Sequence, residues 1–255
     1  MPAAAFFDLD RTLLRRSSAL ALAGTFRERG VIGRGHLARA ALWQLLFAAR
    51  GMSAASLRKV AEEGMAVLDG MAVGELQELV AEAMEPVLKP LVYAEPLALV
   101  QRHRERGEPV YIVSAALQEI VDALAAELDF DGGIGSTCEI VQGVYTGRML
   151  RACHGGAKAG AVRELAERDG IDLAASTAYS DSHSDLPFLE AVGNPVAVNP
   201  DRELRRLAAE RGWAVLEFSE RLVPGGRRRL PAAAVGIPLA LGAGAAIWAA
   251  KRRAA

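Results

Sequence analysis

Ala3-Ala4-Ala5-Phe6-Phe7-Asp8-Leu9-Asp10, close to the start of this 255-residue chain, is the segment that decides the fold. Its apolar part is short and uniform, which predicts a strand buried on both faces of a sheet. The strand runs into two carboxylates, Asp8 and Asp10. Alternate residues of an extended segment project to the same side, so the two carboxylates are expected to lie on the same side of the strand. Because such a pair repels unless a cation lies between its members or one is protonated, it indicates a metal-binding or acid–base site.

Further along the chain, short apolar runs alternate with helical segments. Strands are expected over residues 109–114, 133–136, 176–180, 195–199 and 213–218, and a hairpin over 138–150 that turns at Gln142-Gly143. Helices are expected over 94–106, 117–128, 157–169, 184–192 and 201–211. This alternation predicts an α/β fold, a Rossmann-like parallel sheet with helices on both faces.

The segment between the first strand and this alternating region has a different character. From about residue 17 to residue 88 the pattern is helical, with a broad apolar face over 37–49 and amphipathic stretches over 56–68 and 73–88. It is expected to be a helical module inserted into the sheet domain. The predicted catalytic core is therefore residues 1–14 and 89–222, the insert residues 15–88, and a basic linker with a hydrophobic tail residues 223–255.

Polar residues suited to phosphate chemistry follow the predicted strands. Ser114 ends one strand, Lys158 begins a helix, and Asp181 and Asp185 follow the strand that ends at Ser180. Ligands bind at the carboxyl ends of the strands in sheets of this kind, so these side chains are expected to converge there. Carboxylates suit Mg²⁺, while a lysine and a serine hydroxyl can hold a phosphoryl group.

Four of these segments together resemble the motifs of the haloacid dehalogenase (HAD) superfamily. Asp8-Leu9-Asp10-Arg11-Thr12 is similar to the first motif, Val113-Ser114 to the second, Lys158 to the third, and Asp181-Ser182-His183-Ser184-Asp185 to the fourth. Their order and spacing also agree. The helical insert resembles a type 1 cap. The fourth motif and Tyr145-Thr146-Gly147 resemble subfamily IB, which contains phosphoserine phosphatase.

The resemblance implies a magnesium-dependent phosphomonoester hydrolase with assigned residues. Asp8 would form an aspartyl phosphate, and Asp10 would act as the general acid and base. Asp8, Asp10 (through its backbone carbonyl) and Asp181 would bind Mg²⁺, with Asp185 supporting the metal or Lys158 from behind. Ser114 and Lys158 would hold the phosphoryl group.

The substrate is left open by the sequence. Residues 14–20 read Leu-Arg-Arg-Ser-Ser-Ala-Leu, without the early glutamate expected of an enzyme that acts on phosphoserine. A small phosphorylated metabolite is the first expectation, and Arg15 and Arg16 could meet an anionic one. The alternatives are a lipid-related phosphate, such as lysophosphatidate or a glycerophosphate, a phosphotransferase, and a catalytically silent, membrane-tethered binding protein.

Composition and the chain ends suggest where the protein works. The net charge of −1 gives no reason to expect a nucleic-acid partner. With no N-terminal signal pattern, the catalytic part is expected in the cytoplasm, where Cys138 and Cys153 would stay reduced, although a disulfide across the hairpin is conceivable. Residues 230–250 are uncharged and flanked by basic residues, which predicts a membrane span or anchor or, alternatively, a disordered or peripheral tail.

Overall fold

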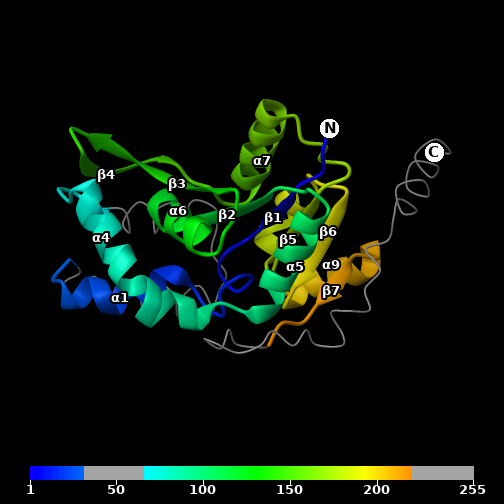
Figure 1. The fold of residues 1–255 in the computed structure, drawn as a ribbon, viewed down its shortest axis with the longest axis horizontal. Helices are drawn as coiled ribbons and strands as arrows, with labels where there is room; N and C mark the ends of the chain where they lie inside the picture. The colour runs from blue at the N-terminus through cyan, green and yellow to red at the C-terminus, as the bar shows by residue number, and fades with distance from the viewer. Residues whose placement is uncertain (32–65, 220–255) are drawn as a thin grey trace.

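A seven-stranded sheet forms the centre of the protein in the computed structural model, which describes residues 1–31 and 66–219 (Figure 1). The strands lie in the order β4-β3-β2-β1-β5-β6-β7, and all neighbours are parallel except the hairpin β3–β4. Their bounds are β1 Ala5–Phe7, β2 Val110–Leu117, β3 Gly132–Val141, β4 Val144–Arg151, β5 Thr177–Ser180, β6 Asn194–Val198 and β7 Ala214–Leu216. The α/β fold with a mostly parallel sheet is thus confirmed.

The uniform apolarity of β1 has the expected structural cause. The strand lies between β2 and β5, and every one of its residues is buried. Phe6 and Phe7 point to opposite faces, because Phe6 belongs to one hydrophobic cluster and Phe7 to the other. A strand covered on both faces needs apolar side chains in both orientations.

Helices cover both of these faces. On the face of Phe7 pack α5 (Ala94–Glu105) and α6 (Gln118–Glu127). On the face of Phe6 pack α7 (Gly156–Asp169), α8 (Leu186–Leu189) and α9 (Arg202–Arg211). A single turn of 3₁₀ helix, η4 (His183–Asp185), precedes α8, so the helix expected over 184–192 is shorter than the pattern suggests.

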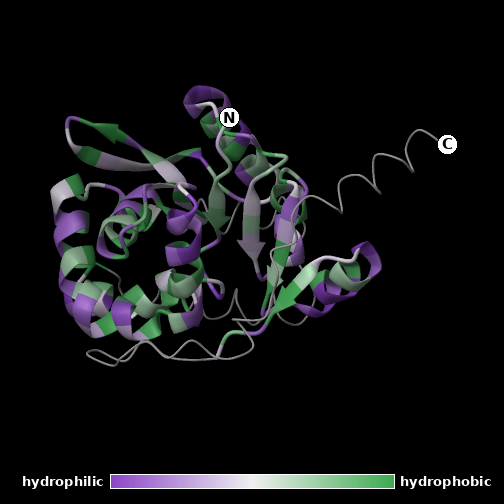
Figure 2. Cartoon of the chain, turned by 45° about the vertical axis from the view of Figure 1, so that its right-hand side comes forward, coloured by the Kyte–Doolittle hydropathy of each residue, from purple (hydrophilic) through white to green (hydrophobic). Residues whose placement is uncertain are grey.

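The segment between β1 and β2 is helical where the structure describes it, as expected. It contains α1 (Ser18–Glu28), η1 (Ala66–Leu68), α4 (Val73–Ala83), η2 (Met84–Leu88) and η3 (Lys89–Leu91). Polar and apolar residues alternate around α1 and α4, as Figure 2 shows, and the apolar residues Leu22, Leu76 and Val80 join the cluster that contains Phe7. The helices expected over 37–49 and most of 56–68 lie outside the described residues.

Two further expectations concern the hairpin and the tail. The hairpin turns at Gln142-Gly143 as expected, but its first strand is continuous with the predicted strand 133–136, because β3 pairs first with β2 and then with β4. Cys138 and Cys153 do not form the disulfide that was the alternative to two reduced thiols. Within residues 1–31 and 66–219 no helix is long and apolar enough to cross a membrane, and the predicted span at 230–250 lies outside these ranges.

Candidate active site

The predicted site residues gather at the carboxyl edge of the sheet, beside its central strands. Asp8 follows β1, Ser114 lies in the second half of β2, and Asp181 follows β5. The chain order runs outward from β1 on both sides, to β2 and β3 on one and to β5, β6 and β7 on the other. This reversal of strand order is the place where open α/β sheets bind ligands.

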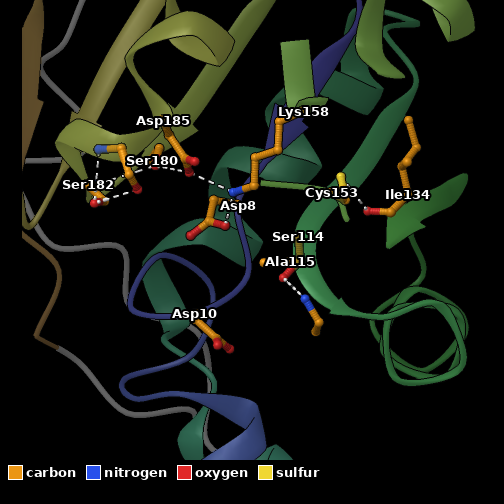
Figure 3. A network of polar contacts seen from close by, with 12 residues as sticks. Asp8, Asp10, Ser114, Ala115, Ile134, Cys153, Lys158, Ser180, Ser182 and Asp185 are labelled. Atoms are coloured by element: carbon orange, nitrogen blue, oxygen red, sulfur yellow. Dashed lines mark hydrogen bonds and ion pairs between the residues drawn. The ribbon is translucent and has the colours of Figure 1, made fainter. Parts of the chain in front are cut away.

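Lys158 joins Asp8 to Asp185 at this edge through two buried ion pairs (Figure 3). Its Nζ lies 2.5 Å from Asp8 Oδ1 and 2.6 Å from Asp185 Oδ2. The lysine is in the first turn of α7, which begins after Gly155, a glycine with a φ of 56°. Burial lowers the pKa of Lys158, but the two carboxylates outweigh it and hold the pKa above its usual value. The lysine is therefore a fixed positive charge beside Asp8.

Asp8 and Asp181 are buried carboxylates with raised pKa values. Removal from water raises the pKa of Asp8 to about 7, against the opposing effect of Lys158. Burial likewise raises the pKa of Asp181 to about 6, against the nearby Arg11. Each burial disfavours the charged form, and the negative charges of Asp181 and Asp185 add to the effect at Asp8. A further cation at this edge would stabilise both carboxylates.

This donor set fits a hard cation. Carboxylate and carbonyl oxygens are what Mg²⁺ takes from proteins, usually one or two carboxylates with the remaining positions left to water and phosphate. Among the described residues, no group of three or more His, Cys, Asp and Glu side chains is arranged to hold a metal ion. Asp8 and Asp181, whose pKa values burial raises, are the carboxylates at this edge that a cation would stabilise, which makes them candidate ligands together with backbone oxygen.

Asp10 does not share a side with Asp8, contrary to the expectation from spacing. Its Oδ1 accepts a hydrogen bond of 2.8 Å from the backbone N–H of Ser18 at the start of α1, and Figure 3 shows it apart from the Asp8–Lys158 pair. The physical reason is that β1 ends at Phe7, and the following residues form a turn in which Arg11 has a φ of 65°. The alternation rule holds only while the backbone is extended.

Ser114 is buried at the same edge, but it does not end its strand as expected. Its Oγ accepts a hydrogen bond of 3.1 Å from the backbone N–H of Ala116, within a stretch where the pairing of β2 with β3 is irregular. The strand continues to Leu117, three residues beyond Ser114. The irregular pairing turns the chain toward α6 and leaves a hydroxyl at the edge of the sheet.

Comparison with known proteins gives the family. The model of the haloacid dehalogenase-like hydrolases matches residues 5–190. The chain belongs to this family. A "probable phosphatase" of Mycobacterium tuberculosis is 38% identical to this hydrolase over 259 residues, 98% of the chain and 89% of the relative. The phosphoserine phosphatase SerB1 of the same species is 38% identical over 253 residues, 96% of the chain and 78% of the relative.

A solved structure supports the assignment of the fold. A protein of unknown function from Bordetella pertussis superposes on the hydrolase with a TM-score of 0.74 and 29% identity, over 85% of this chain and 98% of the other. The chain is therefore an enzyme of the HAD phosphatase family, related to phosphoserine phosphatases.

Three further residues of the hydrolase contact the site without having been predicted there. Ser180 Oγ donates a hydrogen bond of 2.7 Å to Asp185 Oδ2, and Arg11 Nε lies 3.3 Å from Asp181 Oδ2. Asp201 accepts a hydrogen bond from the backbone N–H of His183. Arg11 fills a variable position of the first motif, and Ser180 and Asp201 have the ordinary sequence appearance of a strand end and a helix cap.

The side chain of Asn199, which follows β6 at the same edge of the sheet, is engaged away from the site. It donates to Tyr93 Oη and the carbonyl of Phe218 and accepts from the N–H of Phe218, with distances of 3.2, 3.2 and 2.8 Å. Asn199 therefore joins the end of β6 to the segment after β7.

Proposed function

We propose that this protein hydrolyses the phosphate ester of a small metabolite through an aspartyl phosphate on Asp8. The observation that carries the proposal is the buried contact of Asp8 with Lys158, at the strand exit where Ser114 and Asp181 also lie. A buried carboxylate held against a fixed ammonium is positioned as a nucleophile, and the same ammonium can neutralise charge on the transferred group.

The residues then have complementary roles. A carboxylate oxygen of Asp8 attacks phosphorus as the bond from phosphorus to the leaving oxygen breaks, and Asp10 gives that oxygen its proton. Asp10 next takes a proton from the water that attacks the aspartyl phosphate, which releases inorganic phosphate and frees Asp8. Ser114 and Lys158 hold the phosphoryl oxygens, and Asp185 fixes Lys158 through the ion pair of 2.6 Å.

Asp8, Asp181 and the backbone carbonyl of Asp10 would hold Mg²⁺, which enzymes of this family generally use. When bound, the ion would supply positive charge beside the carboxylates, whose charged forms burial disfavours. The backbone N–H of Ser18 engages Oδ1 of Asp10. We therefore assign the proton transfers to Oδ2 of Asp10 and the contact with the ion to its backbone oxygen.

We also propose that residues 15–88 are the cap that selects the substrate. The two connections to this segment run side by side, which supports the assignment. Arg15 N donates to Leu91 O at 2.8 Å, and Tyr93 N donates to Leu13 O at 2.9 Å. An inserted module needs two adjacent chain segments at its base, because the chain must enter and leave it at the same place.

Replacement of the nucleophile tests the reaction. With Mg²⁺ and p-nitrophenyl phosphate, Asp8→Asn should abolish turnover, because an amide is a poor nucleophile. Asp172→Asn, at a half-buried aspartate that precedes β5 at the opposite edge of the sheet, should retain it. A wild-type protein quenched during turnover of a labelled phosphate ester should carry label that hydroxylamine releases. Equal activity of wild type and Asp8→Asn, or label elsewhere than Asp8, would contradict the proposal.

A substrate panel tests the metabolite. Phosphoserine, glycerol phosphates and lysophosphatidate should be compared by kcat/KM, since the relative SerB1 is a phosphoserine phosphatase while residues 14–20 here carry no glutamate. A small polar ester is expected to be preferred, and a dominant preference for lysophosphatidate would contradict that expectation.

A further inference from the structure

Asp201 lies against the loop 181–183, which begins with Asp181, one of the acidic site residues. Its Oδ2 accepts a hydrogen bond of 2.8 Å from the backbone N–H of His183 and one of 3.3 Å from Ser182 Oγ. The backbone N–H of Asp201 donates to the carbonyl of Asp181 at 2.8 Å. Backbone and side chain of one residue thus hold the loop 181–183 at three points.

Asp201 is itself held in a defined position. It follows β6 across Asn199 and Pro200, where Asn199 has a φ of 42° and is fixed to the segment after β7. Its other oxygen, Oδ1, accepts a hydrogen bond of 2.8 Å from the backbone N–H of Leu204 and caps α9. The residue therefore connects a rigid helix end to the loop between β5 and η4.

Helix capping explains only one of these four contacts, the hydrogen bond from Leu204. A cap needs one acceptor oxygen, and serine or asparagine supplies it about as well as aspartate. The second oxygen and the backbone N–H of Asp201 contact the loop instead. An aspartate is the residue that can accept from the helix and from the loop at the same time.

We propose that Asp201 is a positioning residue that holds Asp181 in place for binding the divalent cation. The inference rests on the proposed function, in which Asp181 is a ligand of Mg²⁺. Asp201 contacts the Asp181 backbone and the two residues that follow it, so it fixes the direction in which the Asp181 carboxylate leaves β5. Groups that orient ligands from behind typically change metal affinity when they are removed.

The test is Asp201→Ser in the full chain, with Asp172→Ser as the matched control. Serine keeps the cap on α9 but is too short to reach His183. Asp172 also accepts backbone N–H groups, those of Ala174 and Ala175, but it precedes β5 and so lies at the opposite edge of the sheet. We expect the Kd for Mg²⁺ by calorimetry, and the Mg²⁺ concentration for half-maximal activity, to rise roughly tenfold in Asp201→Ser. Both should stay at the wild-type values in Asp172→Ser.

The outcomes separate the inference from the proposed function. Thermal unfolding checks that the variants are folded. If the serine variant is not folded, Asp201→Asn, which also keeps one acceptor for the cap on α9, repeats the test. Wild-type Mg²⁺ affinity in a folded Asp201 variant, or an equal loss in Asp172→Ser, would overturn the positioning role. Mg²⁺ binding without hydrolysis of any ester by the wild type would overturn the proposed function, while the calorimetry would still decide the role of Asp201. A wild type that binds no Mg²⁺ would overturn both.

Discussion

Arg11 places a positive charge next to a proposed metal ligand. The residue has a φ of 65°, and its Nε lies 3.3 Å from Asp181 Oδ2 although 63% of its side chain is exposed. A non-glycine residue in the left-handed region is uncommon, and here it follows directly from the turn that ends β1. The arginine therefore partly neutralises Asp181 before any cation arrives, and a cation must compete with it.

Removal of this charge should strengthen cation binding. In Arg11→Gln we expect the Kd for Mg²⁺ to fall roughly two- to fivefold, since a largely exposed ion pair is worth less than about 1 kcal/mol. Isothermal titration of the metal-free protein measures it. Arg16→Gln, the same change at an exposed arginine on the approach to α1, is the control and should behave as wild type. Weaker Mg²⁺ binding in Arg11→Gln would mean that the arginine supports the site instead of competing for it.

At the scale of the elements, β3 and α6 are in unusually close contact. A Cβ built on Gly133 would collide with Cγ1 of Val121 on α6 and approach the carbonyl of Ile112 on β2 to 3.4 Å. One residue earlier, a Cβ on Gly132 would make ordinary contact, 3.7 Å from the ring of Tyr111. The close approach of α6 to the sheet thus depends on Gly133, whereas Gly132 has room.

Gly133→Ala should therefore lower the free energy of unfolding by about 1–3 kcal/mol, the usual cost of overpacking, while Gly132→Ala should change it little. In the double variant Gly133→Ala/Val121→Ala the collision is removed. Urea unfolding of wild type, Gly133→Ala, Val121→Ala and the double variant should then show a coupling between residues 121 and 133. Additive effects would indicate that β3 and α6 move apart in Gly133→Ala, so that the cost does not depend on the Val121 side chain.

His103 connects α5 to two strands at the centre of the sheet. Its Nδ1 donates to the carboxylate of Glu108, just before β2, and its Nε2 accepts from Tyr179 Oη of β5 at 2.8 Å. Burial lowers the pKa of His103 below its usual value, with Glu108 acting against the change. The fold therefore favours the neutral ring, whereas the unfolded chain takes up a proton near pH 6.5.

The sign of the pH dependence follows. Below about pH 6.5 the unfolded state binds the extra proton, so the contribution of His103 to stability is present above that pH and is lost as the pH falls toward the lower folded pKa. Free energies of unfolding at a series of pH values from about 7.5 to about 5 should fall more steeply for wild type than for His103→Gln. Parallel curves would show that the imidazole is charged in the fold as well.

At the scale of the whole molecule, much of the sheet and its edge follows from the sequence. The strands were predictable because burial on both faces leaves uniform apolar runs, and the meeting of Asp8, Lys158 and Asp185 follows from the rule that strand ends converge in a parallel sheet. The direction of Asp10 was not, because it depends on the turn conformation after Phe7. The contact of Asp201 with the loop could not be predicted from the sequence either, since an aspartate before a helix looks like a simple cap.

The proposed cap is joined to the core at a second place besides its two connections. The segment 70–73, which leads into α4, pairs with the turn and the start of β4 in the β3–β4 hairpin. Gly70 N donates to Tyr145 O at 3.0 Å, Tyr145 N to Met71 O at 2.9 Å, and Val73 N to Gly143 O at 2.9 Å. Any movement of the cap relative to the sheet must break these bonds or carry the hairpin with it.

Val73→Pro weakens this contact and also alters the packing of the half-buried residue 73 against the hydrophobic cluster that contains Phe7. Val73 is the first residue of α4, where proline is well tolerated, and Ala72 already has the extended conformation that precedes proline, with φ −71° and ψ 143°. The variant loses the N–H that bonds Gly143, at a cost of about 1 kcal/mol. Hydrogen exchange measured by mass spectrometry should be faster in peptides covering residues 141–146, because the hairpin separates from the cap more often. Gly74→Ala, one residue later and with open space for its Cβ, should leave that exchange at the wild-type rate. If Val73→Pro exchanges as slowly as wild type, the hairpin is held by the core alone, and the cap can move without it.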